Sequence, residues 1–169
     1  MKASSAKAIF QALDKHRVKY LVAGGIAVNA HGYLRFTKDI DFVVQLAPEN
    51  IAGTFTALGT LGYRPSVPIT AEQFSDHNNR RQWIEEKKMK VLQFWSDKHP
   101  ETPVDVLIDM PFDFAVELAD ATWKDLRDIG PIPVVKLSTL LQLKRAANRE
   151  QDRIDLENLR LLYPEHINQ

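Results

Sequence analysis

The sequence contains no cysteine, which excludes disulfide bonds, thiolate catalysis and cysteine-based zinc sites. It also lacks any run of about 20 apolar residues, the length needed to cross a bilayer. Charged residues interrupt every apolar stretch near the N-terminus, unlike the apolar segment of a signal peptide. We therefore expect a cytoplasmic protein without membrane contact.

A net charge is also absent, because 22 lysines and arginines balance 22 aspartates and glutamates. This balance argues against extensive non-specific binding to nucleic acid, although a neutral net charge still allows a local basic patch. The 169 residues, 44% hydrophobic and 26% charged, are typical of one globular domain with a proper core. The sequence has no internal repeat or low-complexity segment.

Hydrophobic periodicity and turn residues predict an α+β (α/β-like) fold in which helices and strands alternate. Ser4 or Ser5 and Ser138 are the expected helix N-caps, and Gly62 is expected to end the second long helix. The charged segment 85–90 could be a phosphate-binding patch, but its two glutamates favour a solvated turn. In order, the expected elements are a helix over 4–17, a strand over 20–23, a short helix over 26–33, a strand over 39–44, a helix over 51–61, a loop with at most one short helix over 63–79, a hairpin of strands 81–84 and 91–95, a strand over 103–109, a short helix and a strand between 111 and 128, a proline-containing edge strand over 131–135, and helices over 139–148 and 151–162.

The chain is organised around residues 20–44, which read as a strand, a glycine turn, a short helix and a second strand. Gly24 and Gly25 stand at the head of the short helix, where backbone N–H groups can approach a triphosphate and the helix dipole favours anions. Asp39 and Asp41 are two residues apart on the second strand, so both side chains point to one face, about 6 to 7 Å apart. Two carboxylates at this spacing repel each other unless a cation lies between them.

A third acid, Asp105, lies within the expected buried strand 103–109, where a carboxylate is costly without a partner charge or a metal. If the strands are neighbours, Asp39, Asp41 and Asp105 converge into an oxygen-rich site for two Mg²⁺ ions. Three residues just ahead of the first two acids are placed to neutralise or bond phosphate oxygens: Arg35, Thr37 and Lys38. A glycine pair or a strand aspartate alone is usually structural, but their combination in this order favours a phosphoryl-transfer site.

The order GG, thirteen intervening residues, DID and a later VDV resembles the signature of the DNA polymerase β-like nucleotidyltransferase superfamily. More narrowly, LVAGGIAVNAHGYLRFTKDIDFVV resembles the minimal bacterial and archaeal nucleotidyltransferases, which include the abortive-infection toxin type and, more distantly, the lincosamide and aminoglycoside nucleotidyltransferases. The C-terminal KRAANREQDRIDLENLRLL is similar to the helical end of the toxin-like branch. The resemblance covers most of the chain and is strongest from Gly24 to Asp41.

This resemblance implies a mixed β-sheet flanked by helices, with residues 1–135 as a catalytic domain and 136–169 as a helical segment packed on it. It also implies an enzyme that moves an NMP from an NTP onto an acceptor hydroxyl and releases pyrophosphate, with two Mg²⁺ ions as cofactors. Asp39 and Asp41 would hold metal, and Asp105 would hold the second ion and help to deprotonate the acceptor.

The phosphates would lie on Gly24 and Gly25, with Arg35 and Lys38 as supporting cations. In the toxin-like branch a C-terminal lysine and aspartate also face the site, and Lys144 and Asp152 are the matching positions. Arg149 is a further candidate. A salt-bridge network between the last two helices is the alternative for these three residues, and the sequence leaves both open.

One departure from the family pattern follows the glycine pair. Ile26 stands where many catalytic members carry a small hydroxyl or amide residue nearby, and Asn29 is the residue that could fill that role.

Several functions remain open at this point. The near-neutral charge favours a small molecule or a protein hydroxyl as acceptor, and a tRNA end stays possible through the basic residues between 80 and 90. The alternative is a non-catalytic nucleotide-binding or interaction module, as one half of a toxin–antitoxin pair with an antitoxin protein as partner. A metal-dependent nuclease also uses clustered acids, but it needs no triphosphate cradle, so the glycine pair argues against it.

Overall fold

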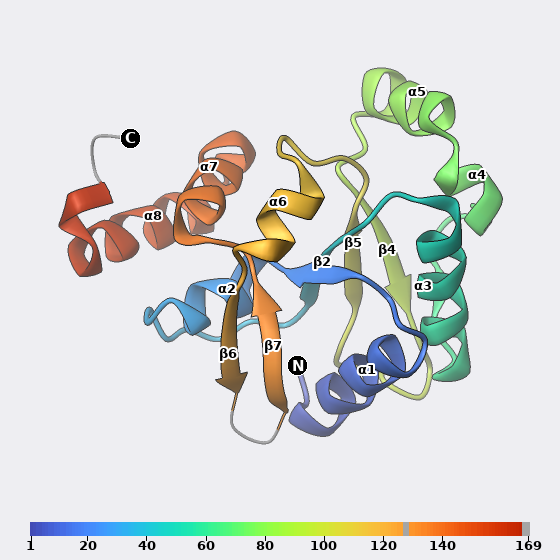
Figure 1. Ribbon diagram of the computed structural model, residues 1–169, viewed down its shortest axis with the longest axis horizontal. Coiled ribbons are helices and arrows are strands. Elements are labelled where there is room, and N and C mark those ends of the chain that lie inside the picture. The colour runs from blue at the N-terminus through green and yellow to red at the C-terminus, as the bar shows by residue number, and fades with distance from the viewer. Residues whose placement is uncertain (127–128, 167–169) are drawn as a thin grey trace.

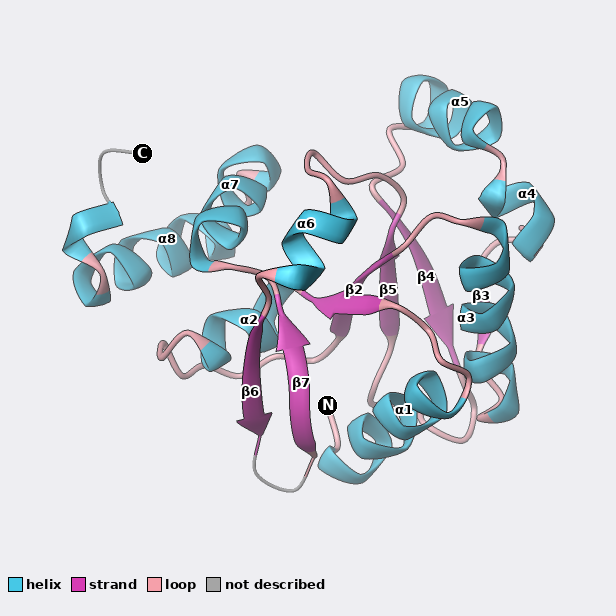
Figure 2. Cartoon of the chain, in the orientation of Figure 1, coloured by secondary structure: helices cyan, strands magenta, loops and turns pink. Residues whose placement is uncertain are grey.

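The computed structural model describes residues 1–126 and 129–166, and seven strands in this part of the chain form one mixed sheet (Figures 1 and 2). The elements are α1 (Ala3–Lys15), β1 (Tyr20–Val22), α2 (Gly24–Ala30), β2 (Ile40–Val44), α3 (Pro48–Thr60), β3 (Arg64–Pro65), α4 (Ala71–Ser75), α5 (His77–Lys87), β4 (Val91–Trp95), β5 (Val104–Leu107), α6 (Phe114–Ala119), β6 (Thr122–Leu126), β7 (Gly130–Val134), α7 (Leu137–Ala147), α8 (Glu150–Leu162) and a final 3₁₀ turn over Pro164–His166.

The strand order is β3-β4-β5-β2-β1-β7-β6, so the first two strands of the chain occupy the centre of the sheet. β1 and β2 are antiparallel, whereas β5 lies parallel to β2 and β7 parallel to β1. In this register Asp41 of β2 is opposite Asp105 of β5, which in turn is opposite Gln93 of β4. The topology therefore brings the second and third predicted acids onto neighbouring strands.

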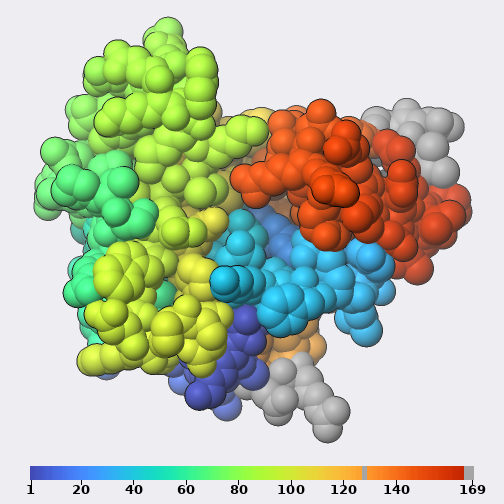
Figure 3. Space-filling view, turned by 180° about the vertical axis from the view of Figure 1, so that it is seen from behind, coloured from blue at the N-terminus to red at the C-terminus, as the bar shows by residue number. Residues whose placement is uncertain are grey.

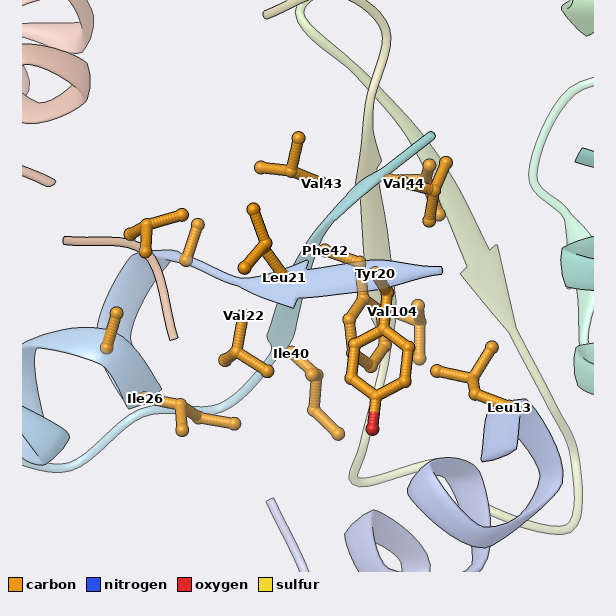
Figure 4. Close-up of a cluster of buried hydrophobic side chains, with 14 of the residues drawn as sticks. Leu13, Tyr20, Leu21, Val22, Ile26, Ile40, Phe42, Val43, Val44 and Val104 are labelled. Carbon is orange, nitrogen blue, oxygen red and sulfur yellow. The ribbon is translucent and has the colours of Figure 1, made fainter. Parts of the chain in front are cut away.

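One face of the central strands is apolar and packs on α1 and α3 (Figure 1). Figure 4 shows Val22, Ile40 and Phe42 pointing to this side, while Leu21 and Val43 point to the other. The rings of Phe10 and Tyr20 meet Phe42 edge-on, with centroid distances of 5.6 and 5.4 Å, an arrangement that adds specific stabilisation to the apolar burial. Since side chains alternate along a strand, Asp41 lies on the face opposite to Phe42.

The predicted hairpin is wrong in its first half, because residues 81–84 and the first half of the charged segment 85–90 belong to helix α5. Asp76 caps this helix by accepting the Asn78 N–H at 2.7 Å, and Lys88 ends it in a left-handed conformation. The glutamates of the supposed turn pair with residues four positions earlier, as in Arg81–Glu85 at 2.8 Å. The strand over Val91–Trp95 is confirmed, but its partners are β3 and β5.

Two further predictions need correction in the surrounding segments. The expected loop over 63–79 contains one short helix, α4, as predicted, but it also contains β3 and the start of α5. The strand over 131–135 is not at the edge, because β6 lies outside it. Prolines are tolerated in β7 since β1 pairs with it only at its end, through Val22 and Val134, and leaves Pro131 and Pro133 without a ladder partner on that side. The helix and strand expected between 111 and 128 are confirmed as α6 and β6, and the last two of those residues lie outside the described part.

The predicted serine caps are also wrong, although their helices are confirmed. α1 begins at Ala3, and Ser5 is buried with its hydroxyl 2.9 Å from His99 Nδ1. Ser138 lies inside α7. The start of this helix is held instead by the Glu117 carboxylate of α6, which accepts hydrogen bonds from the Lys136 N–H at 2.8 Å and from the Thr139 hydroxyl at 2.9 Å. The remaining helices α3 and α8 match their predicted ranges closely.

The helices in the described part of the chain are each too short or too polar to cross a bilayer.

Candidate functional site

A cavity of 550 Å³ opens on the face of the sheet opposite α1. Its walls come from α2 and the segment 35–39, from α7 and the start of α8, and from the end of α5 with the adjoining ends of β4 and β5. Figure 3 shows α7 and the α5–β4 connection on either side of the segment that precedes β2. All but one of the predicted site residues line this cavity: Gly24, Gly25, Arg35, Thr37, Lys38, Asp39, Asp41, Lys144, Arg149 and Asp152. The exception, Asp105, lies beside Asp41 on the next strand.

The glycine pair forms the first turn of α2 and packs directly against the acids. Gly24 has φ +58°, and a Cβ at this position would overlap the carboxylate of Asp41. A Cβ at Gly25 would overlap the Thr37 hydroxyl and lie 2.7 Å from Thr37 Cβ. The backbone N–H of Gly25 favours the ionised form of the Asp41 carboxylate and slightly opposes the rise of its pKa. The absence of side chains at both positions therefore lets β2 and its acid lie against the start of α2.

We expect Gly24→Ala to lower the free energy of unfolding by about 2 to 4 kcal/mol, because the methyl group meets Asp41 and the residue must keep a positive φ. Urea denaturation of the purified variant measures this loss. Gly59→Ala is the matched control, since Gly59 is an exposed helical residue with no atom within 4 Å of the added Cβ. It should stabilise the protein by about 0.5 to 1 kcal/mol. Equal effects of the two substitutions would contradict the close packing of Gly24 on Asp41.

The three acids form one electrostatic cluster. Burial, together with the neighbouring charges of Asp39 and Asp105, raises the pKa of Asp41 to about 7, against a smaller opposing effect of Lys144. Burial also raises the pKa of Asp105, although a hydrogen bond from Gln93 and the charge of Arg149 oppose the shift. The cluster thus carries more negative charge than its surroundings compensate.

These residues fit Mg²⁺ by donor type and by charge, since Mg²⁺ prefers carboxylate oxygens and its charge would offset the burial and the repulsion that raise the pKa of Asp41. In the described residues no three potential metal ligands converge on one point. Two of the carboxylates also accept hydrogen bonds from side chains: Asp39 from the Thr37 hydroxyl at 3.2 Å, and Asp105 from Gln93 at 3.1 Å.

A second charged group lies at the cavity wall, where α7 and α8 meet the segment before β2. Lys144 Nζ is 2.8 Å from Asp152 Oδ1 and 2.7 Å from Asp155 Oδ2. Arg35 binds the same Asp155 carboxylate through two hydrogen bonds of 2.6 and 2.8 Å. Lys144 and Asp152 are buried and Asp155 is 0% exposed. Two cations and two anions are thus paired away from water, as the salt-bridge alternative for Lys144 and Asp152 proposed.

Asp155 belongs to the C-terminal stretch that resembles the toxin-like branch, but it was not predicted as a site residue. Burial alone would raise the pKa of its carboxyl group, but hydrogen bonds from Arg35, Lys144 and Gln151 lower it below the ordinary value. The available signal was its position three residues after Asp152, which places both acids on one face of α8. Asn29 also has a structural partner, since its side-chain amide exchanges two 2.9 Å hydrogen bonds with the backbone of Arg35. Arg35 is therefore fixed from two sides.

Apolar residues make up a large part of the cavity wall and were likewise not predicted as site residues. They include Phe36, which is 80% exposed, and side chains from α5, β4, β5 and α7. The wall residues from α5, β4 and β5 depend on the helix α5 and on the pairing of β4 with β5, whereas the sequence predicted a hairpin over 81–95.

No protein family matches the sequence by its profile, and no curated protein matches it either. The fold is similar to solved structures of nucleotidyltransferases. The solution structure of the antibiotic-resistance factor ANT(2'')-Ia has a TM-score of 0.61 at 14% identity over 98% of this chain and 88% of that one. The lincosamide antibiotic adenylyltransferase LnuA, in its lincomycin-bound crystal structure, has a TM-score of 0.59 at 15% identity over 90% of this chain and 92% of that one.

The crystal structure of ANT(2'')-Ia in complex with adenylyl-2''-tobramycin has a TM-score of 0.59 at 12% identity, over 94% of this chain and 87% of that one. At these identities the likeness concerns the fold. It confirms the predicted α+β class, and the chain has a nucleotidyltransferase fold.

Proposed function

We propose that the protein is a Mg²⁺-dependent nucleotidyltransferase, which transfers an NMP from an NTP to an acceptor hydroxyl and releases pyrophosphate. The observation that carries this proposal is the register of Asp41 opposite Asp105, next to Asp39 and the glycine pair, within a nucleotidyltransferase fold. Clustered carboxylates of raised pKa beside a cavity are typical of a catalytic site.

Each acid has a role in this proposal. Asp39 and Asp41 would hold the ion that binds the triphosphate, and Asp105 would hold a second ion. When bound, these ions would stabilise the charge that develops on the phosphate oxygens. Asp105 would accept the proton of the acceptor hydroxyl. The hydroxyl oxygen of the acceptor would then bond to the α-phosphorus while the bond from this phosphorus to pyrophosphate breaks. Its raised pKa makes it a better proton acceptor than an ordinary aspartate.

The phosphates would lie against the start of α2. Gly24, Gly25 and Thr37 line that part of the cavity, and Lys38 and Arg149 are exposed cations at its border. Lys144 and Arg35 face the same space, but their charges are balanced by Asp152 and Asp155. We therefore assign direct phosphate binding to Lys38, Arg149 and the backbone of the glycine pair. The buried ion pairs of Lys144 and Arg35 with Asp152 and Asp155 have a positioning role.

A small molecule is the acceptor class that the similar structures favour, since one holds lincomycin and another adenylyl-2''-tobramycin. A protein hydroxyl and a tRNA end are the other acceptors compatible with the sequence. The resemblance of the C-terminal sequence to the toxin-like branch would add an antitoxin protein as partner. Under this proposal residues 1–135 are the catalytic domain, and helices α7 and α8 of the segment 136–169 complete its cavity.

Calorimetric titration with ATP, GTP, CTP and UTP tests the proposal. We expect the wild type to bind at least one nucleotide in the presence of Mg²⁺, and binding to disappear when EDTA replaces Mg²⁺. The double substitution Asp39→Ala with Asp41→Ala should also abolish it, while circular dichroism shows an unchanged fold. Nucleotide binding that persists in this variant, or its absence from the folded wild type, would reject the proposal in favour of a non-catalytic interaction module.

A further inference from the structure

The cavity has a second part that the proposed phosphate and metal sites do not use. We call it the apolar lobe, and it is formed by Ile84, Met89, Val91, Leu107, Leu140 and Leu143. Leu140 is buried, but the other five side chains are only partly buried and thus present apolar surface inside the cavity. A partly exposed apolar wall next to convergent polar groups is the usual composition of a small-molecule site.

The strand register places the apolar lobe beside the proposed general base. Leu107 follows Asp105 by two residues on β5, so both side chains lie on the same face of the sheet. On β4, Val91 is opposite Leu107 and Gln93 is opposite Asp105. The glycine pair and Thr37, by contrast, lie on α2 and the segment before β2, on the other side of Asp41. The apolar lobe therefore adjoins the position from which an acceptor oxygen would attack.

The charges around the cavity select against a polycation. Lys38, Lys90 and Arg149 are exposed residues of its lining, and none of them forms an ion pair among the described residues. Asp152 is already paired with Lys144, and Asp39 and Asp41 belong to the proposed metal site. Asp109 is the remaining acid of the lining. Because the proposed function assigns Lys38 and Arg149 to the phosphates, the rest of the lining offers a molecule with several ammonium groups one carboxylate, Asp109, beside the cation Lys90.

We propose that the apolar lobe binds the acceptor, and that this acceptor carries its hydroxyl on an apolar body of low positive charge. The assignment rests on the proposed function, because it uses the roles of Asp105 and the glycine pair. It separates this protein from an enzyme for polycationic acceptors such as the tobramycin of a similar structure. It also predicts that nucleotide and acceptor occupy different parts of the cavity and can be bound together.

The fluorescent probe 8-anilinonaphthalene-1-sulfonate, an apolar body with one negative charge, tests the lobe. We expect Leu143→Glu and Met89→Glu, which lie on different elements, each to weaken its binding by about tenfold or more. Leu161→Glu is the matched control, because Leu161 is 81% exposed on α8 and does not line the cavity. It should leave the affinity within about twofold. Circular dichroism of each variant verifies the fold, and two independent positions keep the test valid if one variant unfolds.

Saturating Mg²⁺ with a non-hydrolysable ATP analogue should leave probe binding to the wild type unchanged, and tobramycin at constant ionic strength should not displace the probe. Unchanged affinity in both lobe variants overturns the proposal. Displacement of the probe by the ATP analogue also overturns it, because the apolar lobe would then hold the nucleobase, and displacement by tobramycin rejects the charge argument. Failure of the non-hydrolysable analogues of all four nucleoside triphosphates to bind, with probe binding intact, instead rejects the proposed function and with it the acceptor role.

Discussion

Asp41→Asn is expected to lower the rate of nucleotidyl transfer by about 10² to 10³-fold and, at the same time, to stabilise the fold. Asparagine keeps an oxygen that can accept the Gly25 N–H, but it removes the charge that repels Asp39 and Asp105. Under the proposed function, loss of a charged ligand would abolish the metal site, whereas loss of the buried, repelling charge would favour the folded state. Activity and stability should therefore change in opposite directions.

The gain in stability depends on pH. Because the pKa of Asp41 is raised to about 7 in the folded state, the folded protein binds more protons than the unfolded chain between about pH 4 and pH 7. The ionised carboxylate thus destabilises the fold increasingly as the pH rises through this window. We expect the melting temperature of Asp41→Asn to exceed that of the wild type by at least about 2 to 4 °C at pH 8 and to match it near pH 4.

Differential scanning fluorimetry and a pyrophosphate-release assay measure the two effects. Asp125→Asn is the matched control, since Asp125 is an exposed strand residue on β6, far from the acids in the strand order. It should change neither quantity. Addition of Mg²⁺ at pH 8 should stabilise the wild type but not Asp41→Asn. A lower melting temperature for the variant at pH 8 would show that Asp41 is a structural acid.

Asp155→Ala is expected to lower the free energy of unfolding by about 3 to 5 kcal/mol, because it leaves Arg35 without its carboxylate partner in a largely buried position. Lys144 keeps Asp152 as a partner but loses its shorter contact. Asp97→Ala is the matched control, since Asp97 pairs with Arg64 at 2.8 Å with both side chains exposed. That substitution should cost no more than about 1 kcal/mol.

Urea denaturation at several pH values checks this prediction. The pKa of Asp155 is lowered in the folded state, so its contribution is fully present above the ordinary carboxyl pKa and is lost as the pH falls through the folded value. The difference between Asp155→Ala and the wild type should therefore narrow below about pH 4. Similar costs for Asp155→Ala and Asp97→Ala would contradict a stabilising role of the buried network.

The sequence predicted the parts of the site that depend on local order. The glycine pair and the first two acids lie within residues 20–44, where strand alternation and turn residues determine which side chains meet. Asp105 could be placed beside the first two acids on one condition, that its strand pairs with β2. The parallel pairing of β2 with β5 meets this condition. The fold class followed from the same alternation of helices and strands.

The remaining features depend on contacts that a periodic pattern does not record. Arg35 and Asp155 are 120 residues apart in the chain, so their pairing could not be derived from spacing. The helix α5 was mistaken for a strand because Arg81–Ile84 contains β-favouring residues, whereas its cap and its four-residue ion pairs determine the structure. The apolar lobe was missed for the same reason, since α5 and the β4–β5 pair form much of its wall.

The central position of β1 and β2 has a consequence for the order in which the protein folds. The unit β1–α2–β2, with the glycine pair and two acids, is complete by residue 44, yet its neighbours β5 and β7 and the carboxylate of Asp155 come from the last two-thirds of the chain. Closing such long loops is slow compared with forming local contacts. The ion pairs of Arg35 and Lys144 with Asp155 can therefore form only after α8 has been synthesised, and the cavity walls from α7 and α8 are added last.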